Sequence, residues 1–394
     1  MNAVTGFGRS DLFAPAISRV ESYIAAHDFA HPTLVLDVEA VERQYRALAN
    51  GLRTDAGGAR IHYAVKANPH ARIIERLVAL GSGFDAASRG EIELVLSQGA
   101  HPDHVSFGNT IKKASDIAFA HAAGITLFAA DAEEELAKIA ENAPGARVYI
   151  RVIVDNPEAD WPLSRKFGCA PASVLGLLDH ARGLGLVPHG LSFHVGSQTR
   201  QPRMWQGTLD QVAEVWHAAR AAGFDLRLLN IGGGFPAFYG EEIAEPTAYA
   251  AAVMDLITDR FGDVAEIMAE PGRGLVAEAG AIAAEVLLVS RKAEGDLHRW
   301  VYLDIGKFSG LAETIDEAIR YQFVTPRDGD VTGPCVLAGP SCDSADVLYE
   351  KRPLSLPLSL RAGDKVTIRN CGAYTSSYSS VGFNGFPPLD VIVI

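Results

Sequence analysis

The residues best suited to chemistry begin with Lys66, which lies in the segment Tyr63–Pro69, at the end of a short apolar run and just before a proline. Burying an ammonium group without a partner is costly and lowers the pKa of a lysine. A lysine with a lowered pKa is nucleophilic and bonds covalently to carbonyl compounds. A lysine at a strand end can also extend into solvent, so Lys66 becomes a candidate nucleophile only together with other residues.

A run of three glycines, Gly232–Gly234, follows the apolar segment Leu228–Ile231. Glycines let the backbone turn tightly and present bare N–H groups to an anion such as a phosphate. The alternative is an ordinary glycine turn. The spacing GxGxxG of dinucleotide-binding proteins and the lysine of a Walker motif are both absent here.

Two further segments carry groups that could serve a ring-shaped cofactor. Glu270 is followed three residues later by Arg273, and His194 lies in Phe193–Ser197. A carboxylate can hold a ring nitrogen protonated, and a histidine can stack on a flat ring or move protons. A surface salt bridge would explain Glu270 and Arg273 equally well, and a backbone hydrogen bond would explain His194.

The elements that must position these residues alternate between strands and helices from about residue 60 to 270. Eight strand–helix units in about 200 residues are typical of a (β/α)8 barrel, with a doubly wound sheet as the alternative. Reactive groups of such barrels lie at the carboxyl ends of the strands. Lys66, Asp85, His194 and Glu270 are all at predicted strand ends, and Arg151 is inside the fifth strand; Asp85 could instead cap a helix. The predicted strands are Ile61–Lys66, Gly83–Ala87, His104–Phe107, Thr126–Ala129, Val148–Val154, Leu191–Val195, Leu226–Ile231 and Ala265–Ala269.

After residue 280 the pattern changes to strands separated by Gly and Pro turns, which predicts a mostly antiparallel β domain. An early strand, Thr33–Asp37, precedes a helix that we expect from about Val38 to Leu48, and we expect this strand to join the C-terminal sheet. The predicted domains are therefore a barrel over 37–279 and a discontinuous β domain made of 1–36 and 280–394.

Composition excludes several classes of function. A net charge of -13 argues against nucleic acid and anionic membranes as partners. No apolar run approaches the length of about 18 residues that spans a membrane, and we expect no secretory leader. The four cysteines are scattered without CxxC spacing, so no metal site is predicted, and a reducing cytoplasm fits best.

These motifs together resemble the fold type III, or alanine-racemase-like, pyridoxal phosphate (PLP) enzymes. Within them, the chain resembles the ornithine/lysine decarboxylases of the eukaryotic type over essentially its whole length. The resemblance rests on six ordered segments: Tyr63–Asn68, Phe193–Ser197, Gly232–Pro236, Glu270–Arg273, Gly339–Asp343, and Gly372–Thr375 with Phe383–Phe386. Lys307–Glu313 is similar to bacterial members of the group.

The resemblance implies a role for each residue. Lys66 would carry the cofactor covalently, His194 would stack on its ring, and Glu270 would pair with the ring nitrogen. Asp85 and Arg151 would support the lysine and the hydroxyl side of the ring. The phosphate would be held by Ser197, Gly233, Gly234, Arg273 and Tyr374.

The resemblance also implies a homodimer whose active sites are shared across the interface. Cys342 would enter from the partner subunit to direct protonation of the carbanion, and Asp343 would bind the distal amine of the substrate. Asp316 falls where ornithine decarboxylases have an aspartate for that ammonium, although Glu313, Asp316, Glu317 and Arg320 also have the spacing of a solvated helix face.

The predicted activity is therefore decarboxylation of ornithine to putrescine, a step of polyamine biosynthesis, with lysine as a further substrate. Racemases of this fold pair the ring nitrogen with an arginine, whereas this chain has Glu270. One methylene separates ornithine from lysine and is worth about 1–3 kcal/mol in a pocket, so residue types do not decide between them. The alternatives are a decarboxylase of carboxynorspermidine or diaminopimelate on the same scaffold, and a catalytically inactive homologue that regulates a partner.

Overall fold

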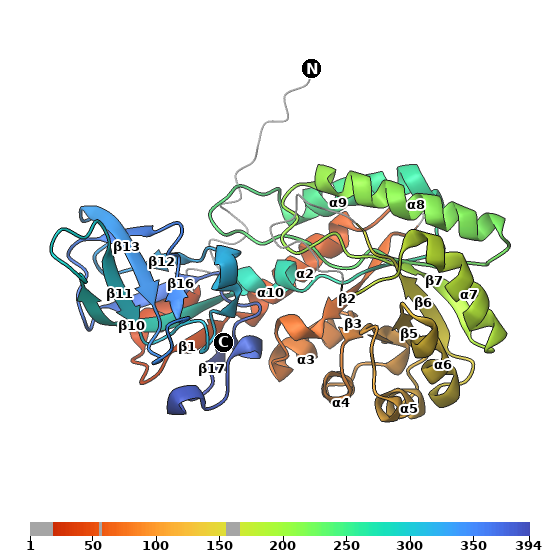
Figure 1. Cartoon of the computed structure of the whole chain (residues 1–394), viewed down its shortest axis with the longest axis horizontal. Helices are drawn as coiled ribbons and strands as arrows, with labels where there is room; N and C mark the ends of the chain where they lie inside the picture. The colour runs from red at the N-terminus through yellow and green to blue at the C-terminus, as the bar shows by residue number, and fades with distance from the viewer. Residues whose placement is uncertain (1–18, 55–56, 155–165) are drawn as a thin grey trace, which may run out of the picture. The chain divides into compact units, whose positions relative to one another are not determined.

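The computed structural model describes residues 19–54, 57–154 and 166–394. The chain divides into two compact units (Figure 1). The barrel unit consists of Gln44–Pro236 and Ile243–Gly274, and the sheet unit contains the described residues up to Arg43, Ala237–Glu242 and Leu275–Ile394.

The barrel unit is a closed ring of eight parallel strands, as predicted. Each strand pairs with the next, and the last pairs with the first. These strands are apolar because both of their faces are covered, by side chains inside the barrel and by helices outside. The strands are β2 (Ala59–Ala64), β3 (Gly83–Ala86), β4 (Val105–Phe107), β5 (Leu127–Ala130), β6 (Arg147–Arg151), β7 (Val187–Ser192), β8 (Leu228–Asn230) and β9 (Glu266–Ala269).

Helices follow the barrel strands and form an outer layer (Figure 1). Ser88 begins α4, because its side chain accepts a hydrogen bond from the Glu91 N–H, and the Glu91 carboxylate accepts one from the Ala87 N–H. Asp85 lies inside β3, so the alternative that it caps a helix is wrong. The helices are α3 (Ala71–Ala79), α4 (Arg89–Ser97), α5 (Ala114–Ala122), α6 (Glu133–Asn142), α7 (Val174–Gly183), α8 (Gln206–Ala221) and α9 (Pro246–Phe261).

Several strand ends differ from the prediction. β2 stops at Ala64, and Lys66 lies in a 3-10 turn over Val65–Ala67. β7 stops at Ser192, so His194 is two residues beyond the strand. Arg151 is the last residue of β6 rather than an interior one. In each case the chain leaves the ladder where its side chains reach the rim of the barrel.

The sheet unit contains nine strands among the described residues. Six of the eight strand pairs are antiparallel, as expected. The early strand β1 (Thr33–Leu36) joins this sheet as predicted, antiparallel to β10 (Gly280–Ser290) and parallel to β17 (Asp390–Val393). The others are β11 (Arg299–Leu303), β12 (Gln322–Val324), β13 (Thr332–Ala338), β14 (Val347–Leu348), β15 (Leu354–Pro357) and β16 (Lys365–Arg369).

The remaining helices are residues 19–26, α2 (Val38–Gly51) and the one-turn α10 (Arg273–Val276). The helix suggested by the spacing of Glu313 to Arg320 does not form. A 3-10 stretch, Ala312–Glu317, is broken at Asp316, whose φ of 54° is in the left-handed region. A regular helix therefore does not account for Asp316.

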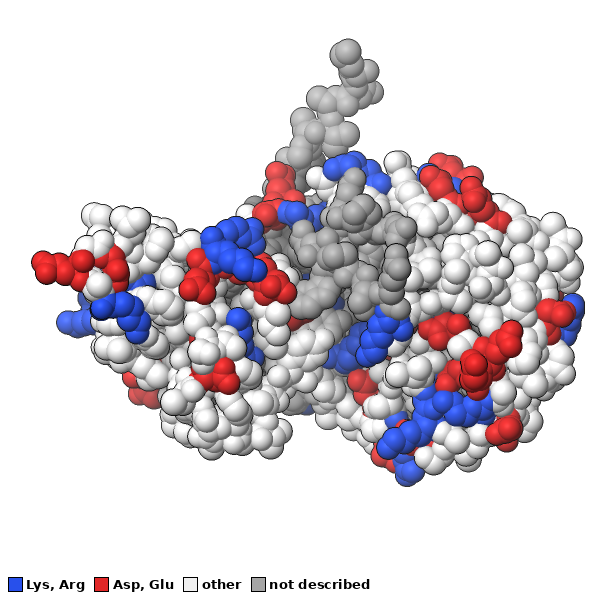
Figure 2. All heavy atoms as spheres, in the orientation of Figure 1, with Lys and Arg blue, Asp and Glu red and all other residues white. Residues whose placement is uncertain are grey.

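The surface seen in Figure 2 carries interspersed acidic and basic side chains, and neither sign covers a continuous area of this face. Within the described part of the chain, no helix combines the length and the apolar character needed to cross a membrane.

Candidate active site

A cavity of about 230 Å³ lies at the carboxyl ends of the barrel strands. Its lining includes five residues that the sequence singled out: Lys66, Asp85, Arg151, His194 and Glu270. They come from five different strand ends, separated by up to about 200 residues in the chain, and the closed barrel brings them together.

Lys66 is held by a rigid turn but is itself exposed. Its neighbours Val65 and Ala67 are buried, and the Tyr63 hydroxyl donates a hydrogen bond of 3.0 Å to the Asn68 carbonyl, which closes the turn. The expectation of a desolvated lysine is therefore wrong for this chain by itself. The turn presents the amine to the cavity instead of burying it.

Glu270 follows β9 and is held in place by Asn230. The Asn230 side chain donates to Glu270 Oε1 at 2.5 Å and accepts from the Gly232 N–H at 2.9 Å. Burial, together with the nearby charge of Asp85, raises the pKa of Glu270 to about 8. A cation bound next to Glu270 would have the opposite effect and favour its ionised form.

Asp85 and Arg151 provide a second pair of charges in the cavity. Burial raises the pKa of Asp85, and the charges of Lys66 and Arg151 oppose that change. The Arg151 guanidinium lies 5.0 Å from the centre of the Phe167 ring, which restricts its orientation. The protonation of Asp85 therefore depends on the balance between its burial and the charges of Lys66 and Arg151.

His194 presents a neutral ring. Its Nδ1 accepts a hydrogen bond of 3.0 Å from the Gly196 N–H, which leaves the ring proton on Nε2. Burial and the neighbouring charges of Arg151 and Lys66 hold its pKa well below the usual value. The backbone hydrogen bond that could by itself explain His194 is therefore present, and the ring lines the cavity as well.

The glycine run lies so close to neighbouring backbone that no larger residue would fit. Gly234 has a φ of +98°, and a Cβ at this position would lie 2.6 Å from the Gly196 carbonyl oxygen. A Cβ on Gly233 would lie 2.8 Å from the Glu270 carbonyl oxygen. Close by in the barrel unit, the buried Arg273 donates to the Ser197 hydroxyl at 3.2 Å. Bare N–H groups, a hydroxyl and a guanidinium form a donor set that suits a phosphate.

Four predicted site residues belong to the sheet unit. Cys342 and Asp343 are exposed in the loop after β13, where the Cys342 N–H donates to Asn384 Oδ1 at 2.8 Å. Asp316 is also exposed and pairs with Lys351 at 3.4 Å. Tyr374 is half-buried with a φ of 55°. These residues do not line the barrel cavity within one chain, and their roles stay predictions.

The sequence interpretation missed several polar or small residues of the cavity. Those that line it are Ala87, Gly108, Asn109, Tyr149, Ser192 and Asn230, and Ser106 donates to the lining residue Asp85. Asn230 and Ser106 are each a single polar residue inside a short apolar strand, so the interruption of the apolar pattern was a usable signal. Tyr149 gave no such signal, because aromatic residues are common in strands.

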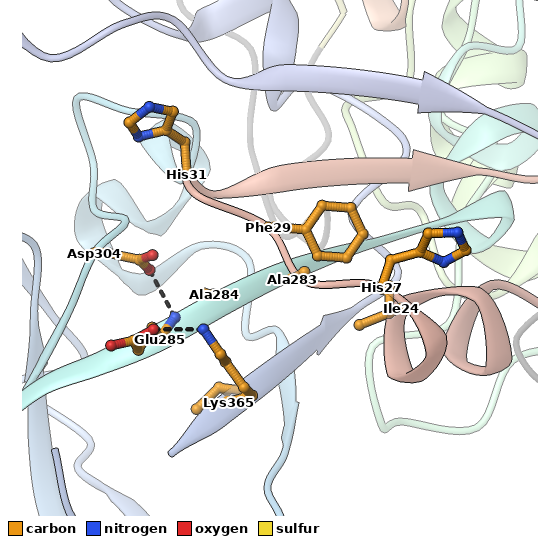
Figure 3. Close-up of a pocket in the computed structure, with 10 residues that line it drawn as sticks. Ile24, His27, Phe29, His31, Ala283, Ala284, Glu285, Asp304 and Lys365 are labelled. Atoms are coloured by element: carbon orange, nitrogen blue, oxygen red, sulfur yellow. Dashed lines mark hydrogen bonds and ion pairs between the residues drawn. The ribbon is translucent and has the colours of Figure 1, made fainter. Parts of the chain in front are cut away.

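A second cavity, in the sheet unit, is much smaller, at about 40 Å³ (Figure 3). Its walls come from β10, β16 and the segment before β1, including His27 and Phe29. Its charged groups are bonded to each other: Lys365 pairs with Glu285 at 2.5 Å, and the Glu285 N–H donates to Asp304 at 2.8 Å. This space is large enough for one or a few water molecules but too small for an aromatic ring.

Residues 38–277 match the family model for the pyridoxal-binding domain of pyridoxal-dependent decarboxylases. The chain belongs to this decarboxylase family. A decarboxylase of Aspergillus flavus is 34% identical over 372 residues, which cover 91% of this chain and 84% of that protein. A lysine/ornithine decarboxylase of Selenomonas ruminantium is 32% identical over 370 residues, or 94% of this chain and 91% of that protein.

Solved structures of the decarboxylase family are similar across the whole fold. SrLDC in complex with PLP and cadaverine is 31% identical, with a TM-score of 0.83, over 96% of this chain and 93% of that chain. The arginine decarboxylase of Paramecium bursaria Chlorella virus, bound to agmatine, is 29% identical with a TM-score of 0.85, over 96% of this chain and all of that chain.

Pyridoxal phosphate is therefore the cofactor of this chain, and the barrel cavity fits it. The backbone at Gly233 and Gly234, which carries no side chain because a Cβ there would collide with neighbouring carbonyl groups, suits the phosphate together with Arg273 and Ser197. Lys66, His194 and Glu270 supply an amine, a neutral flat ring and a carboxylate to the same cavity.

Proposed function

We propose that the chain decarboxylates L-ornithine to putrescine and accepts L-lysine as a further substrate. The observation that carries the proposal is the carboxylate of Glu270, held by Asn230 in the same cavity as Lys66. When bound, pyridoxal phosphate supplies a cationic ring that accepts the electron pair left on the substrate when CO2 departs. Glu270 would keep the ring nitrogen protonated, which an arginine could not do.

The other residues of the barrel unit would orient the reactants. Lys66 would hold the cofactor between turnovers and release it to the substrate amine. The neutral ring of His194 would pack flat against the cofactor, since an uncharged imidazole adds no repulsion to a cationic ring. Ser197, Gly233, Gly234 and Arg273 would bind the phosphate, and Asp85 and Arg151 would orient the ring hydroxyl side and Lys66.

We further propose that two copies of the chain share their active sites. Cys342 of the sheet unit has an exposed thiol, and Asp343 has an exposed carboxylate, and residues that enter a partner's active site must be exposed in this way. In this proposal Cys342 delivers a proton to the α-carbon, Asp343 and Asp316 bind the distal ammonium, and Tyr374 contributes to the phosphate site. A cytoplasmic location is in keeping with four cysteines that carry no disulfide.

Arginine is a second candidate substrate. The viral arginine decarboxylase aligns over all of its own chain with 96% of this chain, so a protein of this size and fold can act on arginine.

The test is product analysis by mass spectrometry after the purified, cofactor-loaded protein is incubated separately with ornithine, lysine, arginine, diaminopimelate and carboxynorspermidine. We expect putrescine as the main product and a loss of about three orders of magnitude or more in the Lys66→Ala variant. Agmatine as the main product would show that arginine, and not ornithine, is the main substrate. Bound cofactor without any product from the five compounds would favour the regulatory homologue.

A further inference from the structure

Tyr149 is a buried tyrosine whose hydroxyl reaches the barrel cavity. It belongs to β6, and its ring packs in the barrel interior with Leu127, Leu228 and Met268. Only 2% of its surface is exposed, yet it lines the cavity. Within residues 19–54, 57–154 and 166–394, its hydroxyl has no hydrogen-bond partner.

The neighbours of this hydroxyl are the charged groups of the site. A Cβ on Gly108 would lie 1.8 Å from Asp85 Oδ1 and 3.2 Å from the Tyr149 hydroxyl, so both groups lie closer to the Gly108 backbone than a larger residue would allow. Burial, followed by the nearby carboxylates of Glu270 and Asp85, holds the pKa of Tyr149 well above its usual value. The hydroxyl therefore stays protonated and acts as a donor.

Ser106 is the closest alternative partner. It is near enough to favour ionisation of Tyr149, but its own hydroxyl is directed to the Phe84 carbonyl at 3.4 Å and to Asp85 at 3.5 Å. The Ser106 oxygen could still accept a hydrogen bond, but it makes none with the Tyr149 hydroxyl, which has no partner among the described residues. The Tyr149 hydroxyl is therefore left to be satisfied from the cavity side.

Most buried hydroxyl groups in folded proteins are hydrogen-bonded, so one without a protein partner requires an explanation, such as a bound group or a water molecule beside it. Here the open side of the hydroxyl is the cavity that takes the cofactor. We propose that Tyr149 donates a hydrogen bond to bound pyridoxal phosphate and is a further cofactor-binding residue of this chain. Because the contact is to the cofactor, it is independent of which amino acid is the substrate.

The test is the Tyr149→Phe variant of the full chain, which removes the hydroxyl alone. Cofactor affinity is measured by titrating pyridoxal phosphate into the cofactor-free protein, and stability by urea denaturation of the same preparation. We expect the Kd for the cofactor to rise about 3- to 10-fold, the effect of losing one hydrogen bond. The urea midpoint of the cofactor-free protein should stay the same or rise, because the removed group has no partner there.

Tyr349→Phe is the matched control. Tyr349 is equally buried, but its hydroxyl donates to the Ile319 carbonyl at 3.0 Å and accepts from the Tyr321 N–H at 2.9 Å. This variant should lower the urea midpoint and leave the Kd for the cofactor unchanged. An unchanged Kd in Tyr149→Phe would overturn the proposal, since a trapped water would then be the partner. A fall in its urea midpoint, or failure to fold, would overturn it as well by assigning the hydroxyl to the protein's own hydrogen bonding.

Discussion

Two cavities of this protein, one in each unit, contain similar residue types and use them in opposite ways. In the sheet-unit cavity, Lys365 pairs with the Glu285 carboxylate, and the Glu285 N–H donates to Asp304, so these groups are bonded to other groups of the same cavity (Figure 3). In the barrel cavity, Glu270 is held through one oxygen by Asn230, and the Tyr149 hydroxyl has no partner among the described residues.

The difference lies in how the groups are supplied. Neighbouring strands β10 and β16 place Glu285 opposite Lys365 in register, and such cross-strand pairs satisfy each other directly. The barrel instead brings together single groups from separate strand ends. Glu270 and His194, for example, are each held by a hydrogen bond to a neighbouring residue, Asn230 and Gly196. The donors and acceptors that these neighbours do not use are available to a ligand. In a structural cluster of the same residue types, they are used within the protein.

The largest effect is expected behind the barrel cavity, at the buried ion pair of Lys112 and Glu135. Lys112 Nζ lies 2.9 Å from Glu135 and donates to the carbonyls of Asn109 and Ala129, and Asn109 lines the cavity. Lys112→Met should lower the free energy of unfolding by about 3–5 kcal/mol, because the buried Glu135 carboxylate then loses its buried cationic partner.

The control for Lys112→Met is Lys138→Met, which removes the partly exposed second partner of Glu135. Its expected cost is about 0.2–1 kcal/mol, and both values come from urea denaturation. Equal costs for the two variants would show that burial does not distinguish the two pairs.

An intermediate effect is expected for Glu270→Gln in the cavity itself. The rate of decarboxylation should fall by about 10²–10³-fold while the cofactor still binds, because glutamine cannot hold the ring nitrogen protonated. Steady-state kinetics and cofactor titration measure the two quantities. Loss of binding with an unchanged rate per bound cofactor would contradict the role assigned to Glu270.

The same variant tests the pKa of Glu270 through stability. Since the folded-state pKa is raised to about 8, the folded protein binds a proton that the unfolded chain has lost. The stability of the cofactor-free protein should therefore decrease as the pH rises from 7 through 8, and Glu270→Gln should reduce that slope. The pH range stays above 6.5 because the lowered pKa of His194 acts in the opposite sense below it. A slope that is equal in both proteins would assign it to other groups, such as Asp85.

The smallest effect is expected in the sheet-unit cavity. Lys365 and Glu285 are both partly exposed, so Lys365→Met should cost about 0.2–1 kcal/mol of unfolding free energy. A double-mutant cycle with Glu285→Gln isolates the pair, and activity should be unchanged. A coupling energy well above this range would mean that the small cavity is as dry as the barrel interior.

The apolar pattern of the strands was sufficient to predict the eight-stranded barrel, the mostly antiparallel sheet and the pairing of the early strand with that sheet. These follow from the sequence because a strand covered on both faces is mostly apolar. Lys66, His194, Glu270 and the glycine run could be found for a related reason, since each interrupts such a pattern at a strand end. No strand was predicted at β12, β14 or β15, which are two to four residues long and lie outside the regular strand–helix alternation that marks the equally short β4 and β8.

What the tertiary structure decided was which groups are satisfied and which are free to act. The partner of Glu270 is Asn230, 40 residues away, and the neighbours of Tyr149 come from β3, β4 and β9. The kink at Asp316 and the exposure of Lys66 likewise depend on local geometry that residue spacing does not encode. Residue types alone determined what chemistry was available, but hydrogen bonds act over about 3 Å, and only the folded barrel sets distances on that scale between residues far apart in the chain.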